Sequence, residues 1–252
     1  MVGPDYLKKI SPKSYFIRKQ VGYIALLLGS TIAKISVKGK WHLPKKKGYI
    51  VASNHFSYVD PSFFKYAIQK PINFLAASDQ EVEWYFLWAI HLYGFIPINR
   101  EKISPSAIKK AKKVLKNGEI LGIFPEGSTT SPFLREPKNG AVFLSTVEKA
   151  PIVPISIYGA ETVWQDIFKG IRPRVYINIG KPFGPYQIKG NKEEKLIKTK
   201  EIGSEMAARI ASLLPKNKRG KYKEDKRIQK FQIENGIKPK EAMLSPYYDP
   251  LL

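Results

Sequence analysis

The sequence predicts an α/β domain with a mixed, partly parallel sheet flanked by helices. At 252 residues, of which 43% are hydrophobic and 12% aromatic, the chain can bury one substantial core. Short apolar runs alternate with longer helical patterns along most of its length, which is the order that builds parallel strands joined by helices. We expect an N-terminal helical segment over residues 1–40, one main domain over residues 41–215 and a C-terminal tail over residues 216–252.

The elements follow one another closely. Residues 48–53 form a short apolar run that predicts a buried strand leading into Asn54 and His55. Asp60, followed by Pro61, has the form of an N-cap with proline at the first helical position, so a helix is expected to about residue 68. The other expected strands are 72–77, 95–99, 120–124, 152–158 and 174–179, and the other expected helices are 80–92, 105–116, 140–148 and 192–214. Beyond residue 215 the weak periodicity predicts a loosely packed tail.

The charge of the chain points to anionic partners. Its 43 Lys and Arg residues outnumber its 21 Asp and Glu residues, which gives a net charge of +22. Such a chain is attracted to nucleic acid, anionic lipid or an acidic carrier protein. Residues 1–47 hold eleven basic side chains against the single acid Asp5. The absence of cysteine excludes disulfides, thiolate metal sites and a cysteine nucleophile, and we expect neither a metal nor a cofactor.

An apolar segment without charges occupies residues 20–33. As a helix its fourteen residues would span roughly 21 Å, against roughly 30 Å for the hydrocarbon core of a bilayer. Aromatic and basic residues flank it, including Tyr15, Phe16 and Arg18. The length favours a helix lying in the membrane interface. A span with snorkelling ends and an ordinary core helix remain open as alternatives.

His55 and Asp60 are the candidate catalytic residues. Transfer of an acyl group to a hydroxyl needs a base to take the hydroxyl proton, and histidine suits this role near neutral pH. A carboxylate that accepts the other ring N–H would fix the tautomer. Asp60 could do so only if the turn between the two residues folds back. Without its neighbours the pair has a structural alternative, in which Asp60 only caps its helix.

Four segments in order along residues 54–156 carry a resemblance to a known family. They are NHFSYVD at residues 54–60, GFIPINR at 94–100, FPEGST at 124–129 and VPIS at 153–156. The first resembles the His-x4-Asp motif of the glycerolipid acyltransferases, the family that includes 1-acyl-glycerol-3-phosphate acyltransferases. The other three are similar to that family's second, third and fourth blocks. Any one block would be weak evidence, whereas four in the same order are specific.

The resemblance implies direct acyl transfer, with His55 as general base and Asp60 orienting it. It places the remaining site residues around the acceptor, where Arg offers a planar fork to phosphate and glycine admits backbone N–H groups to an anion. The implied acceptor-binding residues are Asn54, Arg100, Glu126, Gly127, Ser128, Thr129 and Lys138. Thr129 stands where the family's third block has arginine, so Arg135 or Lys138 is expected to help.

The predicted function is transfer of a fatty acyl group from acyl-ACP or acyl-CoA to the sn-2 hydroxyl of lysophosphatidic acid, giving phosphatidic acid. Residues 41–215 would be the acyltransferase domain, held at the cytoplasmic face of the cell membrane by an anionic lipid surface. The departure at Thr129 leaves glycerol-3-phosphate or another lyso-lipid open as acceptor. Two alternatives of another class are a non-enzymatic protein of anionic membranes and a nucleic-acid-binding protein. We expect no nucleic-acid partner, because no nucleic-acid-binding motif is present.

Overall fold

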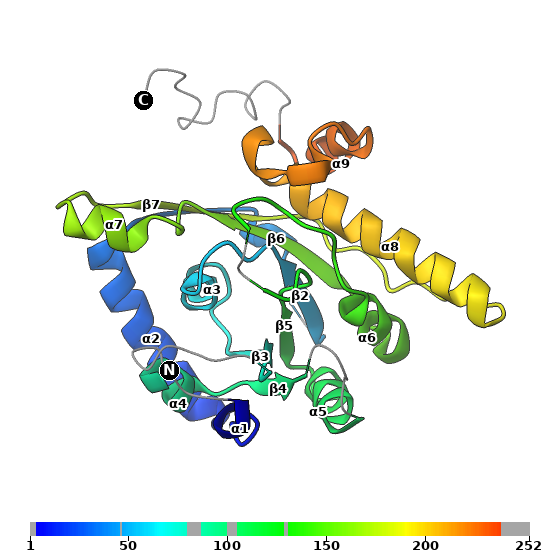
Figure 1. Cartoon of the computed structure of the whole chain (residues 1–252), viewed down its shortest axis with the longest axis horizontal. Coiled ribbons are helices and arrows are strands. Elements are labelled where there is room, and N and C mark those ends of the chain that lie inside the picture. The colour runs from blue at the N-terminus through cyan, green and yellow to red at the C-terminus, as the bar shows by residue number, and fades with distance from the viewer. Residues whose placement is uncertain (1–3, 46, 80–86, 100–104, 129–130, 238–252) are drawn as a thin grey trace.

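The protein has three layers, with helices on both faces of one sheet (Figure 1). The computed structural model describes residues 4–45, 47–79, 87–99, 105–128 and 131–237. The sheet has seven strands in the order β1-β7-β6-β2-β5-β3-β4 among these residues. All neighbouring strands are parallel except β6 and β7, which are antiparallel. The strands are β1 Lys34–Lys38, β2 Tyr49–Ser53, β3 Ile72–Ala77, β4 Ile96–Ile98, β5 Ile120–Ile123, β6 Ile152–Tyr158 and β7 Arg174–Ile179.

Each face of the sheet is covered by its own hydrophobic core. Along β2, Ile50 and Ala52 belong to one core, and Tyr49 and Val51 belong to the other. A strand buried on both faces needs apolar residues at every position, which explains its unbroken apolar sequence. The first core contains α5 Pro105–Lys116, α6 Gly140–Glu148, α8 Lys192–Ser212 and α9 Arg227–Glu234. The second contains residues of α1 Pro4–Leu7, α3 Asp60–Ala67, α4 Leu87–Tyr93 and α7 Val163–Phe168, together with Ala33 directly after α2 Tyr15–Ile32.

The predicted α/β class, with a mixed sheet flanked by helices, is confirmed. The structure also shows elements that the periodicity did not predict. Residues 34–38, expected to belong to the N-terminal helical segment, form the edge strand β1 beside β7. Residues 216–237, expected to be packed on the domain or loosely attached to it, are packed on it, because they contain α9 and bury Tyr222 and Phe231 in the core. Two short helical turns, η3 Lys216–Lys218 and η4 Gly220–Tyr222, join α8 to α9.

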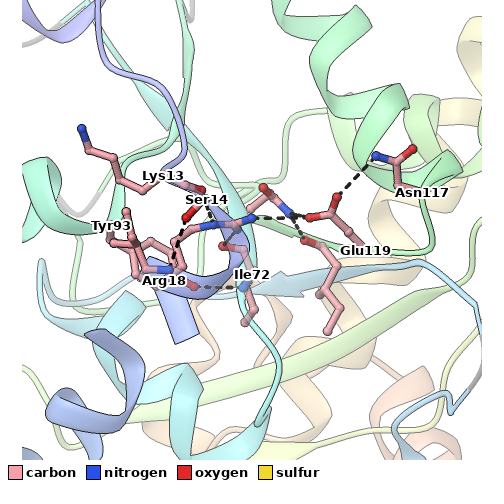
Figure 2. Close-up of polar contacts among 10 residues, drawn as sticks. Lys13, Ser14, Arg18, Ile72, Tyr93, Asn117 and Glu119 are labelled. Carbon is pink, nitrogen blue, oxygen red and sulfur yellow. Dashed lines mark hydrogen bonds and ion pairs between the residues drawn. The ribbon is translucent and has the colours of Figure 1, made fainter. Parts of the chain in front are cut away.

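Helix α2 is fixed to the domain by polar contacts, which Figure 2 shows around Arg18. The Arg18 side chain is buried, and its guanidinium donates to Lys13 O at 2.9 Å and to Ile72 O at 3.2 Å. It also reaches Glu119 at 3.4 Å and lies over the Tyr93 ring. Since Glu119 and Ile72 lie at the beginnings of β5 and β3, Arg18 ties the first turns of α2 to that edge of the sheet.

Candidate active site

The candidate active site lies at the edge of the sheet where the parallel strands β2, β5 and β6 end. His55 comes two residues after β2. Its ring stacks on Phe124, the residue after β5, with 3.9 Å between ring centroids and 18° between ring planes. Phe64 and Phe74 pack in turn against Phe124. The imidazole is therefore supported by an aromatic wall that belongs to the core.

The turn after His55 folds back and brings Asp60 to it. His55 Nδ1 lies 3.0 Å from Asp60 Oδ2, and this oxygen also accepts the N–H groups of Phe56 and Ser57, both at 2.9 Å. An oxygen that accepts two backbone hydrogen bonds is an acceptor for the ring as well, so Nδ1 carries the proton. His55 Nε2 is then left as the basic nitrogen, as the proposed role requires.

The prediction that Asp60 is an N-cap is wrong in its detail. Helix α3 begins at Asp60 itself, and Val59 occupies the N-cap position without a side-chain hydrogen bond. The Asp60 carboxylate turns backward to the loop that precedes the helix instead of forward to the helix N–H groups. The carboxylate bonds to the loop because two backbone N–H groups of the loop converge on Oδ2.

The Asp60 carboxyl group is almost completely buried. Burial raises the pKa of this carboxyl above its ordinary value, and the hydrogen bond and charge of His55 offset part of the rise. The nearby Glu161 adds to the rise through like-charge repulsion. Asp60 Oδ1 has no hydrogen-bond partner in the part of the chain that the structure describes. All the described hydrogen bonds of the Asp60 carboxylate are therefore made by Oδ2.

Glu126 links the His55 turn to the loop that follows β5. Its Oε1 accepts the backbone N–H of His55 at 3.0 Å, and its Oε2 accepts the backbone N–H of Arg135 at 3.0 Å. The Arg135 guanidinium lies 3.5 Å from the same Oε2. Burial raises the pKa of the Glu126 carboxyl, against the lowering effect of these donors. Both oxygens are occupied by the protein, so in this structure Glu126 positions His55 and does not face an acceptor.

The other third-block residues form a tight turn. Gly127 has φ +77°, a conformation that favours glycine, and a Cβ there would lie 3.2 Å from Lys138 Cε. The exposed Lys138 therefore runs alongside Gly127, as the sequence suggested. Arg135 Nη2 lies 2.6 Å from both the carbonyl oxygen and the hydroxyl of Ser128. Gly127, Ser128, Arg135 and Lys138 are thus brought together beside Glu126.

Asn54 has a different position from the one that the resemblance implied. It is fully buried, and its amide group pairs with the backbone of Ile157 on β6, accepting at 2.9 Å and donating at 2.6 Å. The amide therefore joins β2 to β6 just before His55. Two further predicted residues, Arg100 and Thr129, lie outside the described residues.

The sequence reasoning missed two charged residues near the site. Glu161 follows β6 and pairs with Lys218 at 2.8 Å, and Lys218 Nζ lies 5.6 Å from the centroid of the Phe56 ring. The Lys218 carbonyl accepts the N–H of Leu134 at 3.0 Å, which ties residues 216–218 to the loop of Arg135. No motif marks either residue, because they are distant in sequence from the four blocks.

A histidine held by a buried carboxylate at the carboxyl ends of parallel strands has the arrangement expected of a general base. No group of three or more metal-ligating side chains occurs in the described ranges.

Comparison with known proteins gives the family. The acyltransferase family model matches residues 34–158. The 1-acyl-sn-glycerol-3-phosphate acyltransferase of Bacillus subtilis is 34% identical over 152 residues, which cover 59% of this chain and 73% of that protein. The protein of the same name from Streptococcus pneumoniae is 32% identical over 178 residues, covering 69% of this chain and 64% of that protein. The chain belongs to the acyltransferase family.

A solved structure supports the fold. The crystal structure of the 1-acyl-sn-glycerophosphate (LPA) acyltransferase of Thermotoga maritima superposes with a TM-score of 0.53, at 20% sequence identity. The match covers 75% of this chain and 77% of that one. At this identity the similarity concerns the fold, and it extends beyond the segment matched by the family model.

Proposed function

We propose that this acyltransferase moves a fatty acyl group from an acyl thioester to the sn-2 hydroxyl of lysophosphatidic acid, giving phosphatidic acid. The observation that carries the proposal is the His55–Asp60 pair, with Nδ1 at 3.0 Å from Oδ2 and Nε2 left basic. The names of the relatives from Bacillus subtilis and Streptococcus pneumoniae support lysophosphatidic acid as the acceptor.

The proposed chemistry is a direct transfer. The acceptor hydroxyl oxygen attacks the thioester carbonyl carbon while His55 Nε2 takes the hydroxyl proton. The new C–O bond forms, the C–S bond breaks, and His55 returns the proton to the departing sulfur. Asp60 stabilises the imidazolium that exists between these two proton transfers. The donor would be acyl-ACP or acyl-CoA, both of which are anionic and suit a strongly basic protein.

Binding of the acceptor phosphate is proposed for the loop after β5 together with Arg100. Gly127 and Ser128 offer backbone and hydroxyl groups, and Lys138 lies beside Gly127. Arg135 lies in the same loop and contacts Ser128, and in this proposal it takes the role of the arginine that the family's third block has at the position of Thr129. An altered clamp also keeps glycerol-3-phosphate and other lyso-lipids as secondary acceptor candidates.

The proposal includes docking at the cytoplasmic face of the cell membrane through α2. The outer face of α2 is apolar and exposed, whereas its inner side carries the buried Arg18. This is the reverse of an ordinary surface helix. None of the helices in the described ranges has the length and hydropathy needed to cross a bilayer. The exposed apolar residues, defined here as the α2 outer face, are Phe16, Ile17, Tyr23, Ile24, Leu27, Leu28 and Ile32.

An acyl-transfer assay tests the proposed function. The purified full chain would be given acyl-CoA or acyl-ACP with lysophosphatidic acid, glycerol-3-phosphate, lysophosphatidylcholine or monoacylglycerol. We expect phosphatidic acid from lysophosphatidic acid at the highest rate. A higher rate with another acceptor would identify that acceptor as the substrate in place of lysophosphatidic acid. Absence of transfer to every acceptor by folded protein would reject the proposed function. Binding to DNA but not to anionic vesicles would favour the nucleic-acid alternative.

A further inference from the structure

We infer that α7 and the loop after it form a second membrane-contact surface, which enters an anionic bilayer together with the α2 outer face. Three large apolar side chains stand out from this segment: Trp164 is 54% exposed, Phe168 86% and Ile171 55%. We call them the α7 patch. Clustered exposed aromatic groups are uncommon on a protein surface and mark contacts with partners or membranes, and tryptophan in particular favours the headgroup region of a bilayer.

The α7 patch adjoins the end of α2. Arg172, one residue beyond Ile171, donates through Nη2 to the carbonyl oxygens of Ser30 and Ala33, the latter at 3.3 Å. Figure 1 shows α7 beside this end of α2. Leu28 and Ile32 of the α2 outer face are exposed there. The two apolar surfaces therefore meet at the last turn of α2.

Basic groups surround the α7 patch as anionic headgroups require. Lys34, Lys169 and Arg172 are exposed around the junction of α2 and α7. The acid on α7, Asp166, is only half-exposed and accepts a hydrogen bond from the Thr162 hydroxyl at 2.9 Å. Lysine and arginine beside exposed aromatic groups are typical of surfaces that lie in the interface of anionic membranes.

The α7 patch lies at the same edge of the sheet as the catalytic turn. Helix α7 follows the carboxyl end of β6, next to β2, whose carboxyl end leads to His55. Tyr58, in the turn between His55 and Asp60, is 63% exposed at this edge. A bilayer that contacts both the α2 outer face and the α7 patch would meet the catalytic edge. A lyso-lipid could then reach His55 from the membrane surface.

A second copy of the chain is the competing occupant of the α7 patch. A stable protein interface buries about 800 Å² on each partner. Three side chains on one short helix and its loop provide only part of such an area, whereas a bilayer needs no matching shape. The basic groups around the patch would also repel the same groups on a second copy.

The test uses the full-length chain and two substitutions in the patch, Phe168→Ser and Trp164→Phe. Phe168→Ser should weaken co-sedimentation with phosphatidylglycerol/phosphatidylcholine vesicles about fivefold to tenfold, since it removes an aromatic group that would enter the bilayer. Trp164→Phe should remove a large part of the tryptophan quenching caused by brominated lipids. The matched control is Trp41, which is 76% exposed beyond the far end of the edge strand β1. Trp41→Ser should keep wild-type vesicle binding, and Trp41→Phe should keep the quenching.

Wild-type vesicle binding by Phe168→Ser, or unchanged quenching in Trp164→Phe, would overturn the inference. A wild-type protein that sediments as a dimer without lipid, and becomes a monomer on Phe168→Ser, would assign the patch to a second copy. The inference rests on the proposed function, but the two can fail separately. Acyl transfer by wild-type protein to lysophosphatidic acid in detergent micelles tests the function alone, and Phe168→Ser should keep that micellar rate.

Discussion

The turn from His55 to Asp60 and the α2 outer face depart in opposite directions from the usual pattern of buried apolar and exposed polar side chains. Around His55, polar groups are buried: Asp60 and Glu126 lie inside the protein, and the backbone N–H groups there bond to carboxylates. On α2, apolar groups are exposed, with Leu27 at 68% and Phe16 at 67%. Folding alone explains neither arrangement, because each one costs stability in water.

The difference indicates what each region is built to do. A buried polar cluster is rigid because every displaced group would lose a hydrogen bond in a place that water does not reach. An exposed apolar face is stabilised only when something apolar covers it. Substitutions in the first region should therefore change chemistry and stability, and substitutions in the second should change membrane partition alone.

The largest effect is expected for His55→Ala. Loss of the general base should lower kcat by about 10²–10⁴-fold while vesicle binding stays at the wild-type level. His42→Ala is the matched control, since His42 lies after β1 and its ring contacts Ile179 O on β7 at 2.9 Å, away from the site. The control should keep its kcat. Equal losses in the two variants would contradict the assignment of His55.

Glu126→Ala should reduce both stability and turnover. It leaves the N–H groups of His55 and Arg135 without their acceptor, at a cost of about 1–3 kcal/mol in the free energy of unfolding for each buried group. Glu148→Ala is the control, since the Glu148 side chain is also mostly shielded from solvent but pairs with Lys112 on α5. Chemical unfolding and kcat would be measured for both. A Glu126→Ala protein with wild-type kcat would show that Glu126 does not position His55.

Comparison of the wild-type protein with Glu126→Ala also gives a prediction for the pH dependence of stability. Burial raises the pKa of folded Glu126 above its ordinary value of 4.5, so the folded protein binds this proton more tightly than the unfolded chain does. This contribution to stability is complete below pH 4.5 and is lost as the pH rises through the folded pKa. The difference in unfolding free energy between wild type and Glu126→Ala should therefore become smaller as the pH rises from 4.5 through the pKa of folded Glu126. A difference that becomes larger with rising pH would show that the pKa of folded Glu126 is lowered and not raised.

The smallest effect is expected on the α2 outer face. Leu27→Ser should weaken binding to anionic vesicles about tenfold, which corresponds to part of the burial free energy of a leucine side chain. Unfolding free energy and the micellar acyl-transfer rate should not change. Ile233→Ser on α9, also at an exposed apolar residue, is the control and should bind vesicles as wild type does. If both variants bind equally well, α2 is not a docking surface.

Much of the central fold could be predicted because the strands are buried on both faces. The predicted bounds of β3, β6, β7, α5 and α6 agree with the structure. β1 was missed because it is a short edge strand with an exposed lysine at each end and three half-buried residues between them, directly after a helix. The packing of residues 216–237 was missed because only a few of their side chains, such as Ile228 and Phe231, enter the core.

The site was predictable where its residues are close in sequence. The approach of Asp60 to His55 was a stated condition of the prediction, and the turn fulfils it. The roles of Asn54 and Glu126 could not be derived, because their partners Ile157 and Arg135 are brought near only by the fold. Glu161 and Lys218 are likewise far apart in sequence and are brought together only by the fold. Sequence patterns locate side chains along an element, but they do not show which backbone groups need an acceptor.

The shared carboxylate of Glu126 has an evolutionary consequence. Because one side chain holds both the His55 backbone and the Arg135 backbone, a change at residue 126 would disturb the proposed base and the proposed phosphate-binding loop together. Arg135 is coupled to His55 in this way through its backbone N–H, which shares the Glu126 carboxylate. In the sequence, Thr129 is two residues past Gly127, at the position where the family's third block has arginine. We expect substitutions at positions such as 129 to change acceptor preference while the His55–Asp60 pair is kept, because that pair is held by Glu126 and by the turn after His55.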